Sequence, residues 1–568
     1  MNGRSFHRLK AVRRKLSQDA FILALVGVAA LTGREVFADA KFLRAAEPIP
    51  NSYIVVLANK NAGKSEVKSQ ALSLAKSQGG RAWGLLVQGI KGFGFRGTEA
   101  AAYALSRNPN VAWVEEDGIV HLAWYDDGDT IVVPGPQING GESCSTQGST
   151  TVCTYSPVTT SQITKCTPSS GWNCDDDYWH LDRIDQSTPI SVGNRSYGFT
   201  SNGAGVRVYV LDYGVRGNHA ELAGKVEAGA NMMVDPDLGD NPNVPNCTYN
   251  GTPCEDVYPL DFAPADNPCY GQSLSVNTSH GTAVASVIAG AHVGVARGAN
   301  IVPVKVGVCN GGISKLAVAR GLDWIIGDVV GHAPQRAVVS ISLRFVLASP
   351  EYNQATLCET DQDIDGDGIP DNTSADYTNC VGAIEHNIIE VIKKNVPVVV
   401  AAGNDYHDVD LDGMSRLGYG GSYGSAQYRT ITAGGTMYNI SAGQYSDAIW
   451  TCNAFRDANP PYSSCTRNVG SNYGSAVSIF APAWTVKVAD GNTITGYRPP
   501  GILSSGTSFA APGVAGAIAR ILQKNPSYTV DDVWGKLRGD ADAHGTGNPD
   551  FDPSSVVNRR LLYIDVTD

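Results

Sequence analysis

Four short runs rich in valine and isoleucine constrain the fold of this chain more than any other feature. They are V-R-V-Y-V-L at 206–211, A-N-I-V-P-V-K-V at 299–306, A-V-V-S-I-S-L at 337–343 and V-P-V-V-V-A-A at 396–402. Segments with helical patterning separate them. Continuous apolar strands of this kind are typical of a parallel sheet with helices on both faces. We therefore predict an α/β fold with a mainly parallel sheet, whose site lies beyond the carboxyl ends of the strands.

Composition and charge narrow the class of protein. The 568 residues include 63 glycines and 17% charged residues, which gives enough length for a large core and a further small domain. The formal net charge of −12 argues against nucleic acid or an anionic membrane as a partner. The 12 cysteines include no C-x-x-C pair, so they predict disulfides made in an oxidising compartment rather than a zinc site.

The first 40 residues have the pattern of an export signal. Basic residues between Arg8 and Lys15 precede the apolar run F-I-L-A-L-V-G-V-A-A-L, and the small residues A-D-A follow at 38–40. A membrane anchor is the weaker alternative, because a span needs roughly 20 apolar residues. We expect a removed signal peptide over residues 1–40 and a protein secreted to the periplasm or the medium, by either the general or the twin-arginine route.

A second α/β pattern occupies residues 41–123. It comprises a strand at 52–58, a helix-compatible run at 66–78, an alanine-rich helix at 98–107 and a closing strand at 110–122. This pattern predicts a small α+β domain in front of a larger domain at 124–568.

Long polar stretches interrupt the larger domain. A Gly/Ser/Thr-rich segment with four cysteines spans 123–176, and further excursions cover 232–275, 344–380, 405–420 and 437–470. Loops of this length are usually functional or separately stabilised. We expect disulfide-pinned surface insertions.

Three polar residues at element ends supply a candidate catalytic set. Ser508 lies in S-S-G-T-S-F-A-A-P-G-V-A-G at 504–516, where a hydroxyl-rich turn passes into a small, apolar helix. The start of such a helix favours a developing negative charge. A serine hydroxyl is a weak nucleophile without a base beside it. His280 opens the helical run H-G-T-A-V-A-S-V-I-A-G, and Asp212 ends the first valine-rich strand.

Together these motifs resemble the subtilisin-like serine proteases, most closely the proteinase K branch. The chain order Asp, His, Ser is that of subtilisin, and V-P-V-V-V-A-A-G-N at 396–404 is a fourth matching motif. The resemblance implies a monomeric, secreted serine endopeptidase that cleaves protein or peptide substrates through an acyl-enzyme. Asp212 would orient His280, and His280 would take the proton of Ser508. Asn404 would donate its amide to the oxyanion.

The resemblance implies further features of the site. The implied substrate-binding residues are Ser342, Leu343, Arg344, Ala401, Ala402 and Gly403. Cys269 and Cys309 match positions that are bridged in aqualysin-like members, whereas 247/254, 358/380 and 452/465 are pairs by proximity only. Residues 41–123 resemble an inhibitory propeptide, which packs against the protease and is released near Leu122 to Trp124. An unrelated small domain is the alternative.

Several residues depart from the family pattern. D-Y-G replaces the usual D-T-G or D-S-G, H-G-T-A-V-A-S replaces H-G-T-H-V-A-G, and S-L-R-F at 342–345 replaces S-L-G-G. An inward Arg344 predicts a preference for acidic side chains near the scissile bond, and an outward one predicts a broad apolar preference. With Tyr213 and Ala283, Arg344 keeps open an alternative function, a catalytically impaired binding protein of the same fold.

An acidic loop predicts a structural calcium ion. D-I-D-G-D-G-I-P-D at 363–371 has the D-x-D-x-D-G spacing of an EF-hand-type loop, with Gly368 at the sharp turn. The loop lacks the glutamate at the twelfth position and the flanking helices, so it is more similar to the calcium loops of thrombospondin-type repeats. The candidate ligands are Asp363, Asp365, Asp367 and Asp371. A solvated acidic turn is the alternative.

Overall fold

The computed structural model describes the chain from residue 41 onward, with gaps. The described residues are 41–123, 142–147, 150–155, 178–186, 195–233, 235–238, 247–249, 252–254, 279–307, 312–332, 336–345, 382–407, 409, 414–418, 428–441, 444–449, 470–498, 504–544 and 560–565. Within these ranges, no helix is both long enough and apolar enough to cross a membrane. The predicted signal peptide lies outside them.

A central sheet of eight strands carries the larger domain. Its order is β10–β13–β9–β15–β17–β18–β19, and β20 also pairs with β18. The strands are β9 (Val206–Asp212), β10 (Ala230–Asn231), β13 (Asn300–Lys305), β15 (Arg336–Ile341), β17 (Val398–Ala401), β18 (Ile431–Ser441), β19 (Gln444–Ile449) and β20 (Ile479–Pro482). Every pairing is parallel except β18 with β19. The four valine-rich runs supply β9, β13, β15 and β17, so the predicted mainly parallel sheet is confirmed.

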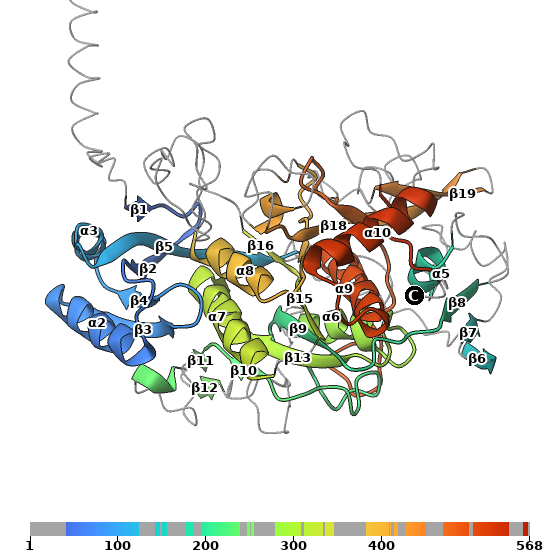
Figure 1. Ribbon diagram of the computed structural model, residues 1–568, viewed down its shortest axis with the longest axis horizontal. Coiled ribbons are helices and arrows are strands. Elements are labelled where there is room, and N and C mark those ends of the chain that lie inside the picture. The colour runs from blue at the N-terminus through green and yellow to red at the C-terminus, as the bar shows by residue number, and fades with distance from the viewer. Residues whose placement is uncertain are drawn as a thin grey trace, which may run out of the picture. The chain divides into compact units, whose positions relative to one another are not determined.

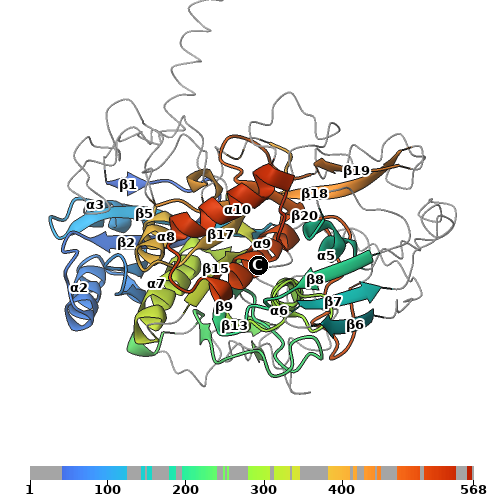
Figure 2. The ribbon, with the colours of Figure 1, turned by 45° about the vertical axis from the view of Figure 1, so that its right-hand side comes forward.

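Helices cover both faces of this sheet, as predicted. Figure 2 shows α6 and α9 on one side of the strands, with α7 and α8 on the other. The helices are α6 (His280–Ala289), α7 (Lys315–Gly331), α8 (Ala383–Lys393) and α9 (Thr507–Lys524). Successive side chains of a strand point to opposite faces. In β9, Val208 and Val210 belong to the core under α6 and α9, whereas Tyr209 and Leu211 belong to the core under α7 and α8.

The strand order indicates where a site should lie. β9 and β15 are neighbours in the sheet, and the chain passes from β9 to β13 on one side but from β15 to β17 on the other, so the connections of these two strands run in opposite directions. In open parallel sheets, ligands bind outside the carboxyl ends of the strands at such a switch point. Asp212 is the last residue of β9, and Ser342 directly follows β15.

Residues 41–123, called the N-terminal segment below, form a second sheet in the order β1–β5–β2–β4–β3. Its elements are β1 (Phe42–Leu43), β2 (Pro48–Leu57), α2 (Lys64–Ser77), β3 (Arg81–Leu86), β4 (Gly92–Arg96), α3 (Glu99–Ser106) and β5 (Val111–Leu122). The sequence from β2 to β5 has the chain order of a split βαβ unit. Val67 of α2 and Leu105 of α3 share one core with Phe93 and Phe95 of β4.

Strand β5 joins the N-terminal segment to the larger domain. Its last residues pair antiparallel with β14 (Ile313–Ser314) and with β16 (Leu343–Arg344), and Figure 1 shows β5 leaving the blue sheet toward β16. Two β5 carboxylates bind helix starts: Asp117 Oδ1 accepts from Leu316 N at 3.1 Å, and Glu115 Oε2 accepts from Ala383 N at 3.2 Å. Carboxylates satisfy the N–H groups that a helix start leaves unpaired, and they complement its dipole.

The remaining elements lie around the two sheets. They are α5 (Trp179–Ile184), α10 (Val530–His544), the 3₁₀ turns η2 (Pro236–Leu238) and η6 (Met414–Leu417), and the strands β6 (Glu142–Gln147), β7 (Thr150–Tyr155), β8 (Arg195–Phe199), β11 (Cys247–Tyr249) and β12 (Thr252–Cys254). The strand registers set Cys247 opposite Cys254 and Cys144 opposite Cys153. The 247–254 disulfide stays a prediction, whereas 144/153 was not among the predicted pairs.

Candidate active site

Asp212 and His280 meet at the end of β9. His280 is the first residue of α6, and its Nδ1 lies 2.8 Å from Asp212 Oδ2. The second carboxylate oxygen, Oδ1, accepts from the backbone N–H of Tyr213 at 2.8 Å. Both side chains are fully buried. An aspartate that accepts from Nδ1 leaves the Nε2 lone pair of the imidazole available as a base.

This meeting depends on a glycine at position 281. A Cβ built on Gly281 would lie 2.2 Å from the carbonyl oxygen of Gly214 and 3.0 Å from Asp212 Cβ. Because no side chain fits in that space, Gly281 lets the first turn of α6 approach β9. The approach brings His280 within hydrogen-bond distance of Asp212.

Ser508 lies at the start of α9, as its second residue, and is fully buried. Its Oγ is 3.3 Å from the carbonyl oxygen of Ser342, and Ser342 Oγ donates to the Ser508 carbonyl at 2.9 Å. The rings of His280 and of Phe509, the next residue, have centroids 6.1 Å apart. The starts of α6 and α9 therefore meet beside the carboxyl ends of β9 and β15.

Asn404 follows β17 and is fixed to the same helix start. Its Oδ1 accepts from both the N–H of Thr507, at 3.0 Å, and the Thr507 hydroxyl, at 2.8 Å. Its Nδ2 is buried and has no hydrogen-bond partner among the described residues. A buried donor without an acceptor costs about 1–3 kcal/mol. That cost would be removed by a ligand oxygen at this position.

The last residue of the N-terminal segment lies against these groups. The N–H of Ala123 donates to the Ser342 carbonyl at 2.9 Å, and the Ala123 carbonyl accepts from the N–H of Ser508 at 3.0 Å. Ala123 is fully buried. The Ala123 carbonyl is therefore bound to the backbone N–H of the candidate nucleophile, a type of donor that can stabilise an oxyanion.

The predicted substrate-binding residues border β5 or lie beside Asn404. Ser342, Leu343 and Arg344 run along β5, with Leu343 opposite Leu122 and Arg344 opposite His121, while Ala401, Ala402 and Gly403 lead into Asn404. Arg344 is ion-paired with Asp405 at 2.8 Å. The predicted preference for acidic side chains depended on an inward Arg344; because Asp405 already pairs with this guanidinium, the pair argues against that preference, which stays a prediction.

A buried cation, Arg498, lies near the Asp212–His280 pair. Arg498 Nη2 donates to the hydroxyl of Ser279, one residue before His280, at 2.5 Å. Burial lowers the pKa of Arg498 to about 10, and attraction to Asp490 and Asp212 opposes this shift. Arg498 is therefore charged at neutral pH.

Tyr213, which departs from the family pattern, is accommodated by a glycine. A Cβ on Gly307 would lie 2.5 Å from Cε1 of Tyr213, so the ring packs directly on the Gly307 backbone. The Tyr213 carbonyl accepts from Lys305 Nζ at 2.5 Å. These contacts leave the bond between the Tyr213 N–H and Asp212 in place.

Some predicted residues lie outside the described ranges. They are the calcium-loop residues Asp363, Asp365, Asp367 and Asp371, and the cysteines Cys269 and Cys309. Within the described part of the chain, no group of three or more His, Cys, Asp or Glu residues could hold a metal ion. The calcium site and the 269–309 disulfide stay predictions.

Comparison with known proteins decides the family. The model of the family described as "Subtilase family" matches residues 203–552, which is more than half of the chain. The chain belongs to the subtilase family. The predicted subtilisin-like fold and family are thereby confirmed, while the proteinase K branch stays a prediction.

Relatives of this subtilase are proteases by name. The Extracellular serine proteinase of Thermus sp. (strain Rt41A) is 28% identical, over 63% of this chain and 60% of its own length. Subtilisin-like protease 1 of Pseudogymnoascus destructans is 26% identical, over 89% of this chain and 90% of its own length. This subtilase thus spans less than two thirds of the Thermus relative.

A solved structure shares the fold. Fervidolysin from Fervidobacterium pennivorans, described as a keratinolytic enzyme related to subtilisin, is 19% identical with a TM-score of 0.50. The match covers 93% of this chain and 62% of that chain. At this identity the likeness concerns the fold alone.

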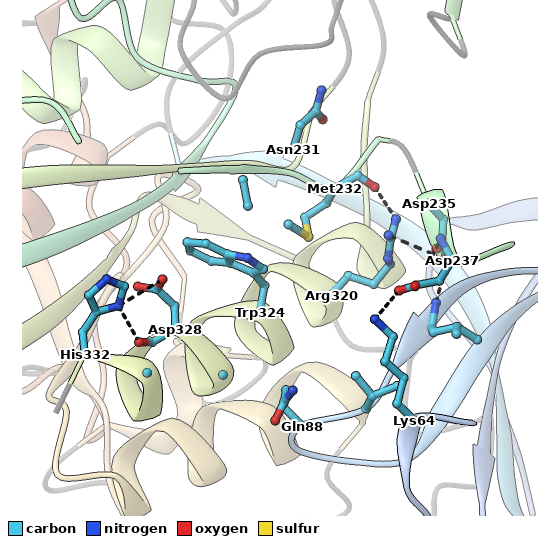
Figure 3. A pocket seen from close by; sticks show the side chains of 15 residues that line it. Lys64, Gln88, Asn231, Met232, Asp235, Asp237, Arg320, Trp324, Asp328 and His332 are labelled. Atoms are coloured by element: carbon cyan, nitrogen blue, oxygen red, sulfur yellow. Dashed lines mark hydrogen bonds and ion pairs between the residues drawn. The ribbon is translucent and has the colours of Figure 1, made fainter. Parts of the chain in front are cut away.

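A pocket of about 520 Å³ in this subtilase lies outside the candidate active site, between the N-terminal segment, β10 and α7 (Figure 3). Its polar groups bind one another across that boundary. Lys64 Nζ lies 2.7 Å from Asp237, and Asp235 Oδ2 accepts from Leu85 N at 2.9 Å. Arg320 contacts the carbonyl of Met232 on the same wall. We therefore assign the pocket to the interface of the N-terminal segment.

Two residues of the site were not found from the sequence. Asp405 follows the A-A-G-N motif directly, but nothing in the sequence connects it with Arg344, 61 positions earlier. Thr507 belongs to the G-T-S motif, so the sequence shows that a hydroxyl group precedes the candidate nucleophile. Its hydrogen bond to Asn404 Oδ1 could not be inferred from the sequence, because Asn404 lies in a distant part of the chain.

Proposed function

We propose that this subtilase is a secreted serine endopeptidase, made as a zymogen whose residues 41–123 are an inhibitory propeptide. The observation that carries the proposal is the position of Ala123. Its carbonyl accepts from the N–H of Ser508, and its N–H donates to Ser342, so the end of β5 has the pose of the acyl half of a peptide substrate.

The first half of the reaction forms an acyl-enzyme. His280 takes the proton of Ser508 Oγ as this oxygen attacks the carbonyl carbon of the scissile bond. Asp212, bound to Nδ1 at 2.8 Å, holds the tautomer and stabilises the imidazolium that forms. The tetrahedral intermediate then expels the amine, which receives the proton from His280. Water repeats these steps on the ester and releases the acid.

Two donors would stabilise the oxyanion of each intermediate. One is the N–H of Ser508, which already binds the Ala123 carbonyl, and the other is Asn404 Nδ2, whose donor capacity is unused among the described residues. Loss of the corresponding asparagine donor in subtilisin lowers turnover by about 10²–10³. Asn404 Oδ1 is occupied by Thr507, so the side chain is oriented before substrate arrives.

Contacts away from the cleft support the inhibitory role of the N-terminal segment. Asp323 of α7 accepts from three successive backbone N–H groups of the segment, those of Val87, Gln88 and Gly89, each at 2.8 Å. Asn387 of α8 accepts from Ile90 N at 3.0 Å. These bonds would hold the segment on the protease after its chain is cut.

Secretion is supported by the sequence pattern of residues 1–40 and by a relative named as an extracellular proteinase. The cysteine content agrees with an oxidising compartment.

The test is labelling with a fluorophosphonate and self-processing of the purified precursor. We expect wild type to be labelled and to be cut between Ala123 and Trp124, as read by N-terminal sequencing. Ser508→Ala should be unlabelled and stay uncut when incubated alone, whereas Ser478→Ala, at a buried serine outside the site, should be labelled. A folded wild type that resists the label would instead favour the catalytically impaired binding protein. Processing of Ser508→Ala would exclude self-cleavage.

A further inference from the structure

We infer that Arg344 and Asp405 close the pocket for the side chain that precedes the scissile bond, so that this protease cleaves after small residues. The inference rests on the proposed function, because it uses β5 as the guide to where a substrate strand lies. It assigns a specificity role to two side chains of this chain.

Strand pairing fixes which side chains share the pocket. β5 and β16 are antiparallel with Leu122 opposite Leu343 and His121 opposite Arg344, so Ala123 is opposite Ser342. Directly opposite residues lie on the same face of a sheet, and alternate residues of one strand do too. The side chains of Ala123 and Arg344 therefore share a face and are diagonal neighbours, about 7–8 Å apart in a regular pair. That separation is within reach of an arginine.

The Arg344 side chain crosses from β16 to the chain that carries Asn404. Its Nη2 lies 2.8 Å from both carboxylate oxygens of Asp405, the residue directly after Asn404. On the way, its Cδ passes 2.9 Å from where a Cβ of Gly403 would stand. The arginine stem thus lies flat on the Gly403 backbone, where φ is +101° and any residue other than glycine would be strained.

These contacts narrow the space for a substrate side chain. On the face that receives the Ala123 methyl group, Ser342 and Arg344 form one side, and we take the stretch from Gly403 to Asp405, which Arg344 contacts, as the other side. The ion pair spans the two sides. The Arg344 side chain is only 15% exposed, so it is packed and does not extend into solvent. A methyl or hydroxymethyl group fits beside this bridge, whereas a leucine or phenylalanine side chain would have to displace it.

Charge matching excludes the acidic substrates that an arginine alone would attract. Asp405 supplies a carboxylate to Arg344, so a glutamate before the scissile bond would compete with it for one guanidinium. Arg344 Nη1 is buried and has no hydrogen-bond partner among the described residues. The oxygen of a serine side chain is small enough to use such a donor. Alanine, glycine and serine are therefore the expected residues, and the segment's own Ala123 is one of them.

The experiment measures peptide cleavage by four processed enzymes: wild type, Arg344→Gly, Asp405→Asn and Arg538→Ala. The substrates share the chain's own Val-His-Leu, from residues 120–122, followed by Ala, Phe or Glu before the scissile bond. Each enzyme is first titrated with a fluorophosphonate, so that kcat/KM refers to active molecules. Arg538→Ala breaks an exposed pair with Asp542 and is the matched control.

Wild type and the control should prefer Ala over Phe. Arg344→Gly should raise the Phe-to-Ala ratio of kcat/KM by about 10–100-fold, the scale on which an apolar pocket discriminates side-chain size. Asp405→Asn leaves the guanidinium without its carboxylate and should raise the Glu-to-Ala ratio. Equal Phe-to-Ala ratios in wild type and Arg344→Gly would overturn the inference, as would a wild type that prefers Phe. A wild type that no fluorophosphonate labels would instead reject the proposed function.

Discussion

Replacing Gly281 with alanine should disable the candidate triad without replacing any of its three side chains. The added Cβ would lie 2.2 Å from the Gly214 carbonyl oxygen, 3.0 Å from Asp212 Cβ and 3.1 Å from Asp212 Oδ1. Carbon–oxygen contacts in proteins are about 3.3–3.6 Å. The first turn of α6 must therefore recede from β9 by about 1 Å. His280 is the preceding residue, so its 2.8 Å bond to Asp212 would lengthen beyond the range of a hydrogen bond.

Two effects follow from this displacement. A misplacement of about 1 Å in a catalytic group can cost about 10²-fold in rate, and overpacking of a buried site costs about 1–3 kcal/mol of stability. We expect Gly281→Ala to lower kcat/KM of the processed enzyme and its rate of self-processing by about 10²-fold. On a Ser508→Ala background, where autolysis does not interfere, Gly281→Ala should lower the free energy of unfolding by about 1–3 kcal/mol in urea.

A second glycine provides the control. Gly513 lies inside α9, five residues after Ser508, and a Cβ there would meet nothing within 4 Å. Gly513→Ala should therefore raise the free energy of unfolding by about 0.5–1 kcal/mol and leave kcat/KM unchanged. If Gly281→Ala keeps wild-type kcat/KM, or if both substitutions lower kcat/KM equally, the close approach of α6 to β9 is not what positions His280.

Two further predictions concern stability. Burial lowers the pKa of His180 to about 4, while its Nε2 donates to Val293 O at 3.0 Å. In the unfolded chain this histidine binds a proton near pH 6.5, so its contribution to the free energy of unfolding is present above that pH and is lost as the pH falls toward 4. His180→Gln keeps a hydrogen-bond donor but does not titrate. Between pH 7 and pH 5, its free energy of unfolding in urea should therefore fall by about 2 kcal/mol less than that of wild type. If Asp363–Asp371 bind calcium, excess chelator should lower the melting temperature and speed autolysis with initial turnover intact, and Asp365→Asn with Asp367→Asn should abolish that shift. The first prediction is contradicted if the free energy of unfolding of His180→Gln falls between pH 7 and pH 5 as much as that of wild type. The second is contradicted if excess chelator does not change the melting temperature.

The sequence was sufficient to predict the sheet and to nominate four residues of the site, because both depend on local pattern. Continuous valine-rich runs indicate strands buried on both faces, and β9 has no exposed residue. Asp212, His280 and Ser508 stand where a strand ends or a helix begins, while the resemblance to subtilisin-like proteases supplied their roles and added Asn404. The carboxyl ends of parallel strands gather at one edge, so residues at element ends come together without any further information.

The direction of Arg344 could not be predicted, because it depends on a partner far away in the chain. Whether its side chain faces the cleft is set by the register of β16 against β5, and its charge is balanced by Asp405, 61 residues later. Tyr213 also depends on a residue that is distant in the chain. Gly307, which lies just after another strand, leaves space for the Tyr213 ring. Departures from a family pattern are therefore interpretable only together with the neighbours that compensate for them.

The contacts of β5 suggest that, in the proposed zymogen, cutting the chain and releasing the inhibitor are separate events. Cleavage after Ala123 would leave the hydrogen bonds from Ala123 to Ser342 and from Ser508 to Ala123 intact, because both belong to the acyl side of the bond. The cleaved segment would also keep the helix-start bonds of Glu115 and Asp117 and the three N–H groups that Asp323 accepts. Of these groups, only the Ala123 carbonyl is altered by hydrolysis of the peptide bond after Ala123, because it becomes part of a carboxylate. The new carboxylate would lie beside Ser508, where its oxygen can still accept from the backbone N–H. Full activity would therefore depend on a second event that removes the segment. A second cut inside residues 41–122 would have this effect, because the contacts with the protease would then be shared between two shorter peptides, and each peptide would bind more weakly than the intact segment.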